Sequence, residues 1–222
     1  MSYFPSEQGR TGEGVQERLA SGLLGKVFGL LAFAMAFAVV GGYVGAQLGS
    51  AYFLPIMIGY FALFFAVQAM REREGINLIL LYAFATATGL LIGPVIQSYL
   101  NAGAGDIVLE AAAITGVMTA GLSAFALTTK RDLSGLAPYL FMALLGLLVT
   151  MIVNIFVGGN LLSVMIGWAG AFIFSGLLII QVQRAKYAPD TMGNAVIITL
   201  GIFLNIVNLF LSVLRILQGG RR

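Results

Sequence analysis

Two carboxylates near the middle of the chain are the first residues whose spacing could do chemistry. Asp106 and Glu110 lie four residues apart, so a helix would place both on one face. Two like charges at that spacing repel each other and can attract a cation. Acidic side chains are also favourable at a helix N-terminus, where they face the positive end of the helix dipole. The pair is therefore a candidate outer cation vestibule, with an ordinary solvated helix start as the alternative.

Neutral amides inside apolar segments form the second candidate site. Asn205 and Asn208 are three residues apart and share a helix face, and Gln181 lies near the end of the preceding apolar segment. Such amides ordinarily hydrogen-bond to neighbouring membrane helices, but a polar stripe can also line a conduction path. The stripe predicts that the last apolar helix is central and surrounded by the others. The sequence leaves both roles, packing and conduction, open.

Enzymatic activity is not expected from the residues present. Gly103–Asp106 matches the GxGD pattern of intramembrane aspartyl proteases, which need two facing carboxylates. The other aspartates, Asp132 and Asp190, fall at the opposite ends of the expected helices. A serine protease needs a histidine base, and the chain has no histidine and no cysteine. The same composition excludes disulfides and thiolate or imidazole metal sites, and we expect no resident cofactor.

Seven apolar stretches must position these side chains. The chain has 222 residues, of which 59% are hydrophobic and 9% charged. Each stretch is about long enough to cross a bilayer, which takes about 20 residues. The stretches cover residues 26–48, 52–70, 76–100, 107–129, 136–157, 161–183 and 192–217. We therefore expect an all-α membrane protein with seven transmembrane helices in one domain (26–217), a flexible cytoplasmic tail (1–25) and a short basic C-terminal tail (218–222).

Basic residues predict the orientation in the lipid bilayer. Most of the 12 Lys and Arg residues precede the first stretch or fall in the loops on the same side. By the positive-inside rule, the N-terminus is cytoplasmic and the C-terminus lies outside. Three arginines, Arg215, Arg221 and Arg222, then fall on the disfavoured side. A re-entrant sixth or seventh stretch, which would return the C-terminus to the cytoplasm, is the alternative. The net charge of the chain is +3. We interpret this excess of basic residues as suited to contact with anionic lipid, not to binding of nucleic acid.

Small residues recur at a spacing of four. The pairs are Gly25 with Gly29, Gly41 with Gly45, and Gly89 with Gly93. Such spacing allows two helices to approach closely. We expect these glycines to pack inside the monomer, with a dimer face as the alternative.

Several segments together resemble the Bax inhibitor-1/YccA family, over nearly the whole chain from about Lys26 to Leu217. They are Gly89–Pro94, Val95–Asp106, Leu127–Ser134, Asn154–Phe156 and Asn208–Leu217. The middle stretch, with GPVIQSYLNAGAGD and LTTKRDLS, is most similar to the YccA branch. The resemblance implies a bacterial inner-membrane protein with two layers of three helices around a central seventh helix.

One function implied by this resemblance is a pH-sensitive calcium leak. Family members of this kind use an aspartate on each of the sixth and seventh spans and an arginine after the second. The resemblance places these positions at Gln181, Asn205 and Arg71. Both acids are thus replaced by amides, which hydrogen-bond but do not ionise. Ca²⁺ is the transported ion under this hypothesis, and we expect the proton gate to be lost.

The other implied function belongs to the YccA branch, whose members bind and restrain the membrane-anchored AAA protease FtsH. This role needs no buried acid, but it can use a cytoplasmic N-terminus that the protease grasps. Residues 1–21 are rich in Gly, Ser, Glu and Arg, and they form a candidate handle. An ordinary frayed terminus is the alternative. We place modulation of FtsH, or of membrane-protein quality control, ahead of the leak.

Overall fold

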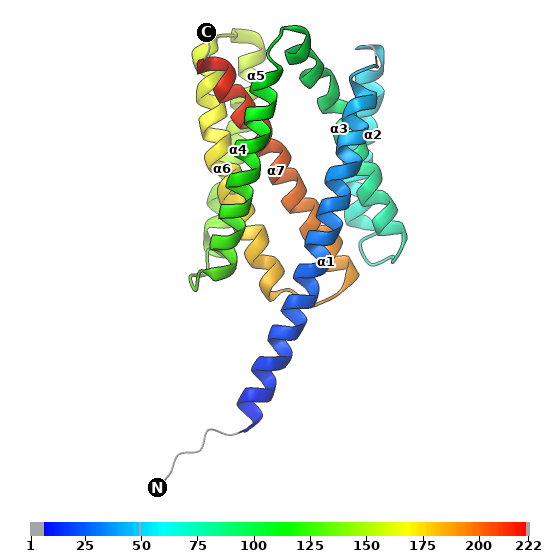
Figure 1. The fold of residues 1–222 in the computed structure, drawn as a ribbon, viewed down its shortest axis with the longest axis vertical. Coiled ribbons are helices and arrows are strands. Elements are labelled where there is room, and N and C mark those ends of the chain that lie inside the picture. The colour runs from blue at the N-terminus through cyan, green and yellow to red at the C-terminus, as the bar shows by residue number, and fades with distance from the viewer. Residues whose placement is uncertain (1–6, 49, 221–222) are drawn as a thin grey trace.

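The structure is a computed structural model that describes residues 7–48 and 50–220. Within these residues the chain forms seven α-helices and two single-turn 3-10 helices, with no strand (Figure 1). The α-helices are α1 (Glu7–Gly45), α2 (Phe53–Ala69), α3 (Ile76–Asn101), α4 (Gly105–Thr128), α5 (Ala137–Val157), α6 (Asn160–Tyr187) and α7 (Met192–Gly220). The 3-10 helices, Ser50–Tyr52 and Ser134–Leu136, precede α2 and α5.

The seven predicted apolar helices are all present, and six are long and apolar enough to cross a membrane. The exception is α2, whose 17 residues span about 26 Å, slightly less than the about 30 Å hydrocarbon core. Helices suit this environment because they satisfy every backbone hydrogen bond within one segment. The expectation of an all-α membrane fold is confirmed.

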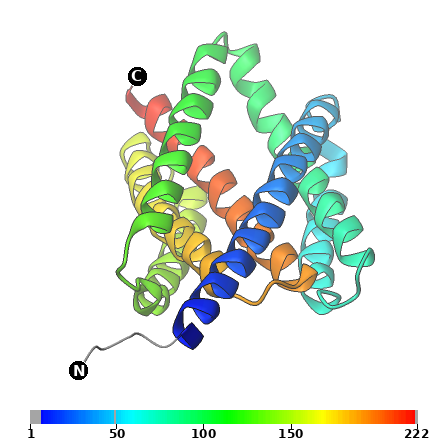
Figure 2. The same cartoon turned by 60° about the horizontal axis from the view of Figure 1, so that its bottom comes forward.

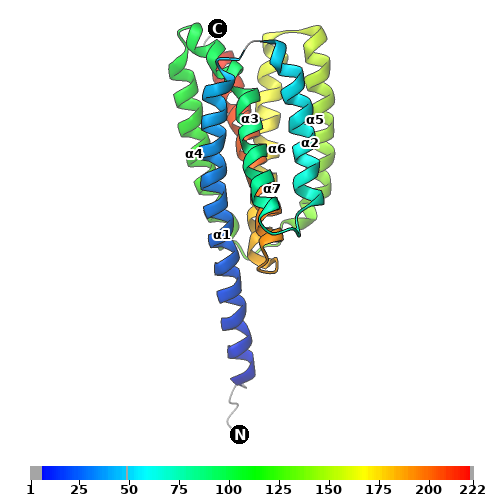
Figure 3. The ribbon, with the colours of Figure 1, turned by 90° about the vertical axis from the view of Figure 1, so that its right-hand side faces the viewer.

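The most buried helix is α7, as the polar stripe predicts. Of its most apolar stretch 56% is buried, against at most 39% for any other spanning helix. It contacts α1, α3, α4 and α6, and it crosses the bundle between α1 and α6 (Figure 2). It begins at the end of the bundle where α1 enters and finishes at the opposite end (Figure 3). The side of the membrane on which the C-terminus lies stays a prediction. The division into two three-helix layers stays a prediction.

Two apolar clusters fill the bundle along α7. The first surrounds the N-terminal half of α7 and includes Phe84 and Phe203, whose ring centroids are 6.2 Å apart. The second surrounds its C-terminal half and includes Phe174 and Leu209. By contrast, only 6% of the apolar stretch that contains α5 is buried. The large apolar side chains that α5 exposes are therefore suited to contact with lipid.

Contact between α1 and α3 is made backbone to backbone at four glycines. They are Gly41, Gly45, Gly89 and Gly93. A Cβ atom at Gly41 would lie 3.0 Å from the carbonyl carbon of Thr86, closer than side chains normally approach. The prediction of packing inside the monomer is correct for these two pairs. It is wrong for Gly25 and Gly29, where a Cβ atom would meet nothing within 4 Å.

The first helix begins at Glu7, well before Lys26, and projects beyond the other helices (Figure 1, Figure 3). The boundary expected at residue 25 therefore falls inside one continuous helix. Residues 1–6 of the predicted N-terminal tail and 221–222 of the C-terminal tail lie outside the described residues. The flexibility of the tail stays a prediction.

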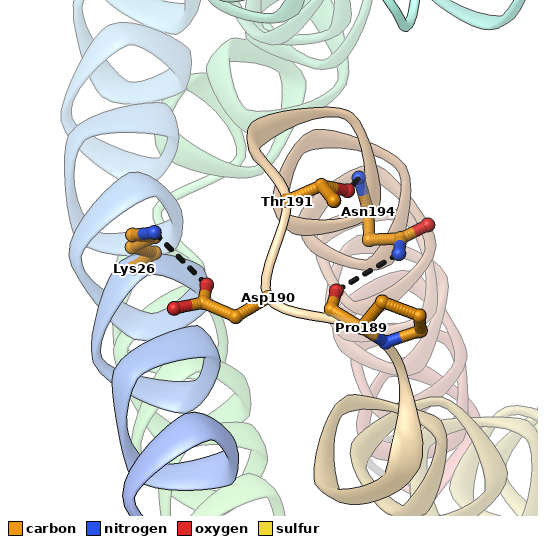
Figure 4. Close-up of polar contacts among 5 residues, drawn as sticks. All are labelled: Lys26, Pro189, Asp190, Thr191 and Asn194. Carbon is orange, nitrogen blue, oxygen red and sulfur yellow. Dashed lines mark hydrogen bonds and ion pairs between the residues drawn. The ribbon is translucent and has the colours of Figure 1, made fainter.

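An ion pair ties α1 to the loop between α6 and α7 (Figure 4). Lys26 Nζ lies 2.9 Å from Asp190 Oδ1, and the Asp190 side chain is only 18% exposed. The same loop starts α7, because Thr191 Oγ1 accepts a hydrogen bond of 3.2 Å from the backbone N–H of Asn194. This is the contact of a helix N-cap. The Asn194 side-chain amide also donates to the Pro189 carbonyl at 2.9 Å.

Candidate functional site

Gln181 lies in the contact between α6 and α7. A Cβ atom at Gly201 of α7 would stand only 2.7 Å from Gln181 Nε2, so the glycine makes room for the amide. Gln181 Oε1 is buried and has no hydrogen-bond partner among the described residues. Buried polar atoms are ordinarily paired. This oxygen can therefore accept a hydrogen bond from a small polar species that reaches the centre of the bundle.

The two asparagines of α7 behave differently. Asn205 lies one turn after Gly201 on the same helix face, and only 8% of it is exposed. Asn208 donates its amide to the Leu204 carbonyl of its own helix at 2.8 Å. Gln181 therefore lies in the α6–α7 contact and Asn205 lies on the face of α7 that meets it, whereas the Asn208 amide is engaged within α7.

Three hydroxyls of α4 and α6 also have buried oxygens without a partner in the described part of the chain: Thr119, Ser123 and Ser175. Ser123 is at about the depth of Gln181, because Lys186 Nζ bonds the Leu127 carbonyl at 3.1 Å and fixes α4 beside α6. The sequence shows that these three lie inside apolar segments, but it does not show whether they are paired. A hydroxyl in a helix can bond its own backbone, as other threonines here do, so its residue type does not show whether it is paired.

Arg71 lies away from the amides. It is exposed in the turn after α2, with its guanidinium 3.4 Å from Glu72. A Cβ atom at Gly193, near the start of α7, would lie 2.8 Å from the Arg71 carbonyl oxygen. Along α7, Gly193 and Asn205 are about 18 Å apart at 1.5 Å per residue. The structure therefore does not bring the three positions named by the resemblance into one site.

The acidic pair is at the opposite end of the bundle from Arg71. Asp106 lies in the first turn of α4 and lines a pocket of about 400 Å³ with Tyr99 and Gln218. In this pocket Tyr99 Oη donates to Gln218 Oε1 at 2.8 Å. Glu110 is exposed and does not line the pocket. The described residues contain no cluster of three or more His, Cys, Asp or Glu suited to a metal, and the cation vestibule stays a prediction.

A buried amide outside the predicted site holds the loop between α4 and α5. Gln183 is 6% exposed, and its Oε1 accepts a hydrogen bond from the Leu133 backbone N–H at 3.1 Å. Its Nε2 donates to the Arg131 carbonyl at 2.9 Å. Both polar atoms of the side chain are thus used. This loop is fixed to α6 at the end of the bundle that carries the basic loops.

Beside this clamp a surface pocket of about 770 Å³ is lined in part by Asp132, Gln183 and Arg184. Asp132 Oδ1 accepts a hydrogen bond of 2.9 Å from the Ser134 backbone N–H. This bond favours the ionised carboxylate and holds the pKa of Asp132 below its ordinary value. The loop therefore keeps a fixed negative charge among its basic neighbours at neutral pH.

Replacing Gln183 by alanine is expected to release the α4–α5 loop. Two hydrogen bonds are lost and two backbone groups lose their partners, at about 1–3 kcal/mol. Tryptic cleavage after Lys130 and Arg131 in folded protein should accelerate about tenfold, since 1.4 kcal/mol corresponds to a factor of ten. Gln68→Ala is the matched control, because Gln68 is exposed and its amide donates at 3.5 Å to the Phe64 carbonyl of its own helix. Equal cleavage rates in both variants would contradict the clamp.

These features define the class of protein. A bundle of seven apolar helices, with neutral amides at its centre and basic loops at one end, is a multi-pass membrane protein. The family described as inhibitor of apoptosis-promoting Bax1 matches residues 20–222. The chain belongs to the Bax inhibitor-1 family, which confirms the family resemblance; assignment to the YccA branch stays a prediction.

Relatives in several bacteria match most of the chain. An uncharacterized protein of Campylobacter jejuni is 29% identical over 231 residues, covering 98% of both chains. An uncharacterized protein of Pseudomonas aeruginosa is 30% identical over 204 residues, covering 90% of both. An uncharacterized membrane protein of Vibrio cholerae is 31% identical over 165 residues, covering 74% of this chain and 73% of its own. The chain is thus similar over most of its length to bacterial proteins, one of which is described as a membrane protein.

Proposed function

We propose that this protein is a YccA-like modulator of the FtsH membrane protease, acting in membrane-protein quality control at the bacterial inner membrane. The observation that carries the proposal is the extension of α1. From Glu7 the helix continues past the other helices, at the end of the bundle where the α2–α3, α4–α5 and α6–α7 loops lie (Figure 1). Those loops are basic, so the positive-inside rule makes this end cytoplasmic. A protease acting there could reach the extension.

The base of the extension is coupled to the bundle. The Lys26–Asp190 ion pair joins α1 to the start of α7, the most buried helix. A Cβ atom at Gly22 would lie 2.8 Å from Asp190 Oδ2, so the loop also packs closely on α1. Force applied to the extension would therefore be resisted where α1 meets α7. A protease that grasps the extension but does not unfold the bundle would remain bound and degrade other substrates more slowly. The proposed modulation of FtsH requires this behaviour.

The neutral centre of the bundle favours this role over the proton-gated leak. Gln181 in the α6–α7 contact and Asn205 on the face of α7 that meets it are amides, which cannot release a proton near neutral pH. Ca²⁺ sites depend on anionic oxygen ligands, and amides supply only dipoles. The burial of α7 supports the arrangement of two helix layers around it that the family resemblance implies.

Deleting residues 2–21 is expected to slow degradation of this protein by FtsH, because the extension that the protease grasps is gone. Turnover is measured by pulse-chase in cells with and without FtsH. A variant in which residues 2–21 are replaced by a Gly/Ser sequence of equal length separates loss of the handle from simple shortening. Unchanged turnover of the deletion variant in FtsH-containing cells would contradict the hypothesis that FtsH grasps the extension.

Co-purification tests the partner itself. The protein, tagged at its C-terminus, is extracted gently from native membranes, and associated proteins are identified by mass spectrometry. Recovery of FtsH or its membrane cofactors at stoichiometric levels is the expected result. Absence of these proteins from the preparation would contradict the interaction with FtsH and favour the alternative function, an ion leak.

The alternative is a pH-independent leak. It is favoured by one observation, the buried oxygens of Gln181, Thr119 and Ser123 that lack partners among the described residues. Such atoms can replace part of the hydration shell of an ion or water that enters the bundle. Flux measurements in liposomes test this function.

A further inference from the structure

An apolar groove opens along one side of the bundle. It has a volume of about 630 Å³ and is lined only by residues from α1, α3, α4, α7 and the residue after α1. One wall is the glycine-rich crossing of α1 and α3. The opposite wall includes Gly116 of α4 and Phe210 of α7. Since all four helices are of spanning length and composition, the medium outside this groove is lipid.

The length of the groove matches one leaflet. Its α1 wall runs from Met35 to Ala46, about 17 Å at 1.5 Å per residue. Half of the hydrocarbon core is about 15 Å. The inner end lies at Met35, near the middle of the spanning part of α1, and the outer end lies at Gln97 and Leu100, near the end of α3. The groove therefore extends from the bilayer centre to the surface opposite the basic loops.

The chemistry of the lining fits a hydrocarbon chain. Gly42 leaves space in the α1 wall, because a Cβ atom there would meet only the Gly89 carbonyl oxygen, at 3.8 Å. The Thr115 hydroxyl inside the groove donates a hydrogen bond to the Ala111 carbonyl at 2.7 Å. Its proton therefore needs no hydrogen-bond acceptor from a molecule in the groove. Other polar groups are confined to the outer end, where Tyr43 is 73% exposed and Gln97 bonds Asn101 at 2.8 Å. Tyrosine is typical of this interfacial depth.

We propose that this groove binds one acyl chain of a phospholipid from the leaflet opposite the basic loops. The methyl end of the chain lies toward Met35, and its ester group lies at the level of Gln97 and Tyr43. The affinity comes from close contact with the glycine wall, because transfer from lipid to protein gains nothing from the hydrophobic effect itself. The proposal does not depend on modulation of FtsH or on ion conduction.

A photoreactive lipid tests the site. The full-length protein is reconstituted in phosphatidylethanolamine/phosphatidylglycerol vesicles containing phosphatidylglycerol with a mid-chain diazirine, irradiated, and mapped by peptide mass spectrometry. Labelling is expected to concentrate on residues 35–46 and 89–100. It should exceed labelling of α5, which exposes more apolar surface but does not line this groove. Excess unlabelled phosphatidylglycerol should reduce the labelling of the groove by a larger fraction than the labelling of α5.

Gly116→Leu is the decisive variant. A Cβ atom at Gly116 meets nothing within 4 Å, so a leucine can enter the groove without moving backbone. Labelling of residues 35–46 should fall several-fold. Gly121→Leu is the matched control, because Gly121 is on the same helix, equally unobstructed, and outside the groove. Its labelling pattern should equal that of the unmodified protein.

Two outcomes overturn the proposal. Labelling that follows exposed surface over all helices, and does not respond to Gly116→Leu, would show annular lipid only. Labelling of α5 without labelling of the groove would show that another helix, from a second copy or another protein, covers it. The distribution on the unmodified protein decides between these results even where the leucine variant fails to fold.

Discussion

Replacing Gly41 by alanine is expected to destabilise the bundle, unlike a methyl addition at an unobstructed glycine of α1. The new Cβ atom would lie 3.0 Å from the carbonyl carbon and 3.1 Å from the Cα of Thr86, with the carbonyl oxygen nearer still. Backbone cannot rotate away as a side chain can, so α1 and α3 must separate. Overpacking of this kind typically costs about 1–3 kcal/mol. The change is measured as a lower midpoint of unfolding, by thermal or denaturant titration in detergent micelles.

Gly29→Ala is the control for this prediction. It adds the same methyl group to the same helix, but a Cβ atom there meets nothing within 4 Å. Its unfolding midpoint should match that of the unmodified protein. Gly89→Ala, which meets Gly42 N at 2.7 Å from the facing helix, should destabilise like Gly41→Ala. The two changes together should cost less than their sum, because either one already separates the helices. Equal midpoints for the Gly41 and Gly29 variants would show that the crossing tolerates a wider spacing.

Most of the fold could be predicted because lipid restricts the choices. The apolar run expected at 76–100 is helix Ile76–Asn101, and that expected at 136–157 is helix Ala137–Val157. A membrane-spanning segment must be helical, so hydropathy alone locates it. The start of α1 could not be located in this way. Residues before Gly22 are polar, and hydropathy carries no signal for a helix that continues into water.

The depth of the candidate site could also be predicted, but not the direction of its side chains. Gln181 and Gln183 are the same residue type two positions apart, and two helical residues rotate a side chain by about 200°. Gln181 consequently meets Gly201 of α7, whereas Gln183 holds the α4–α5 loop through Leu133 and Arg131. Only the packing of α6 decides which of the two faces the centre.

Introducing aspartate at both Gln181 and Asn205 is expected to create Ca²⁺ flux that depends on pH. Two carboxyl groups would then lie on the α6–α7 contact, supplying the anionic oxygens that Ca²⁺ prefers. Two interacting carboxyl groups titrate as a unit and take up a proton as the pH falls. Flux should therefore fall as the pH falls, because the protonated pair offers no charge. The measurement is Ca²⁺ uptake into liposomes containing a calcium-sensitive dye, over a pH series.

Gln181→Asn separates charge from shape in this experiment. With Asn205 unchanged, it is the neutral isostere of the double-aspartate variant and differs from it only in charge. It should show no pH-dependent flux, and neither should the unmodified protein, because an amide takes up no proton in this range. Robust pH-gated flux through the unmodified protein would mean that another group gates it and that the loss of both acids does not remove the gate. Ca²⁺ flux well above that of protein-free liposomes, equal in the unmodified protein and in Gln181→Asn at every pH, would instead favour the pH-independent leak over the interaction with FtsH.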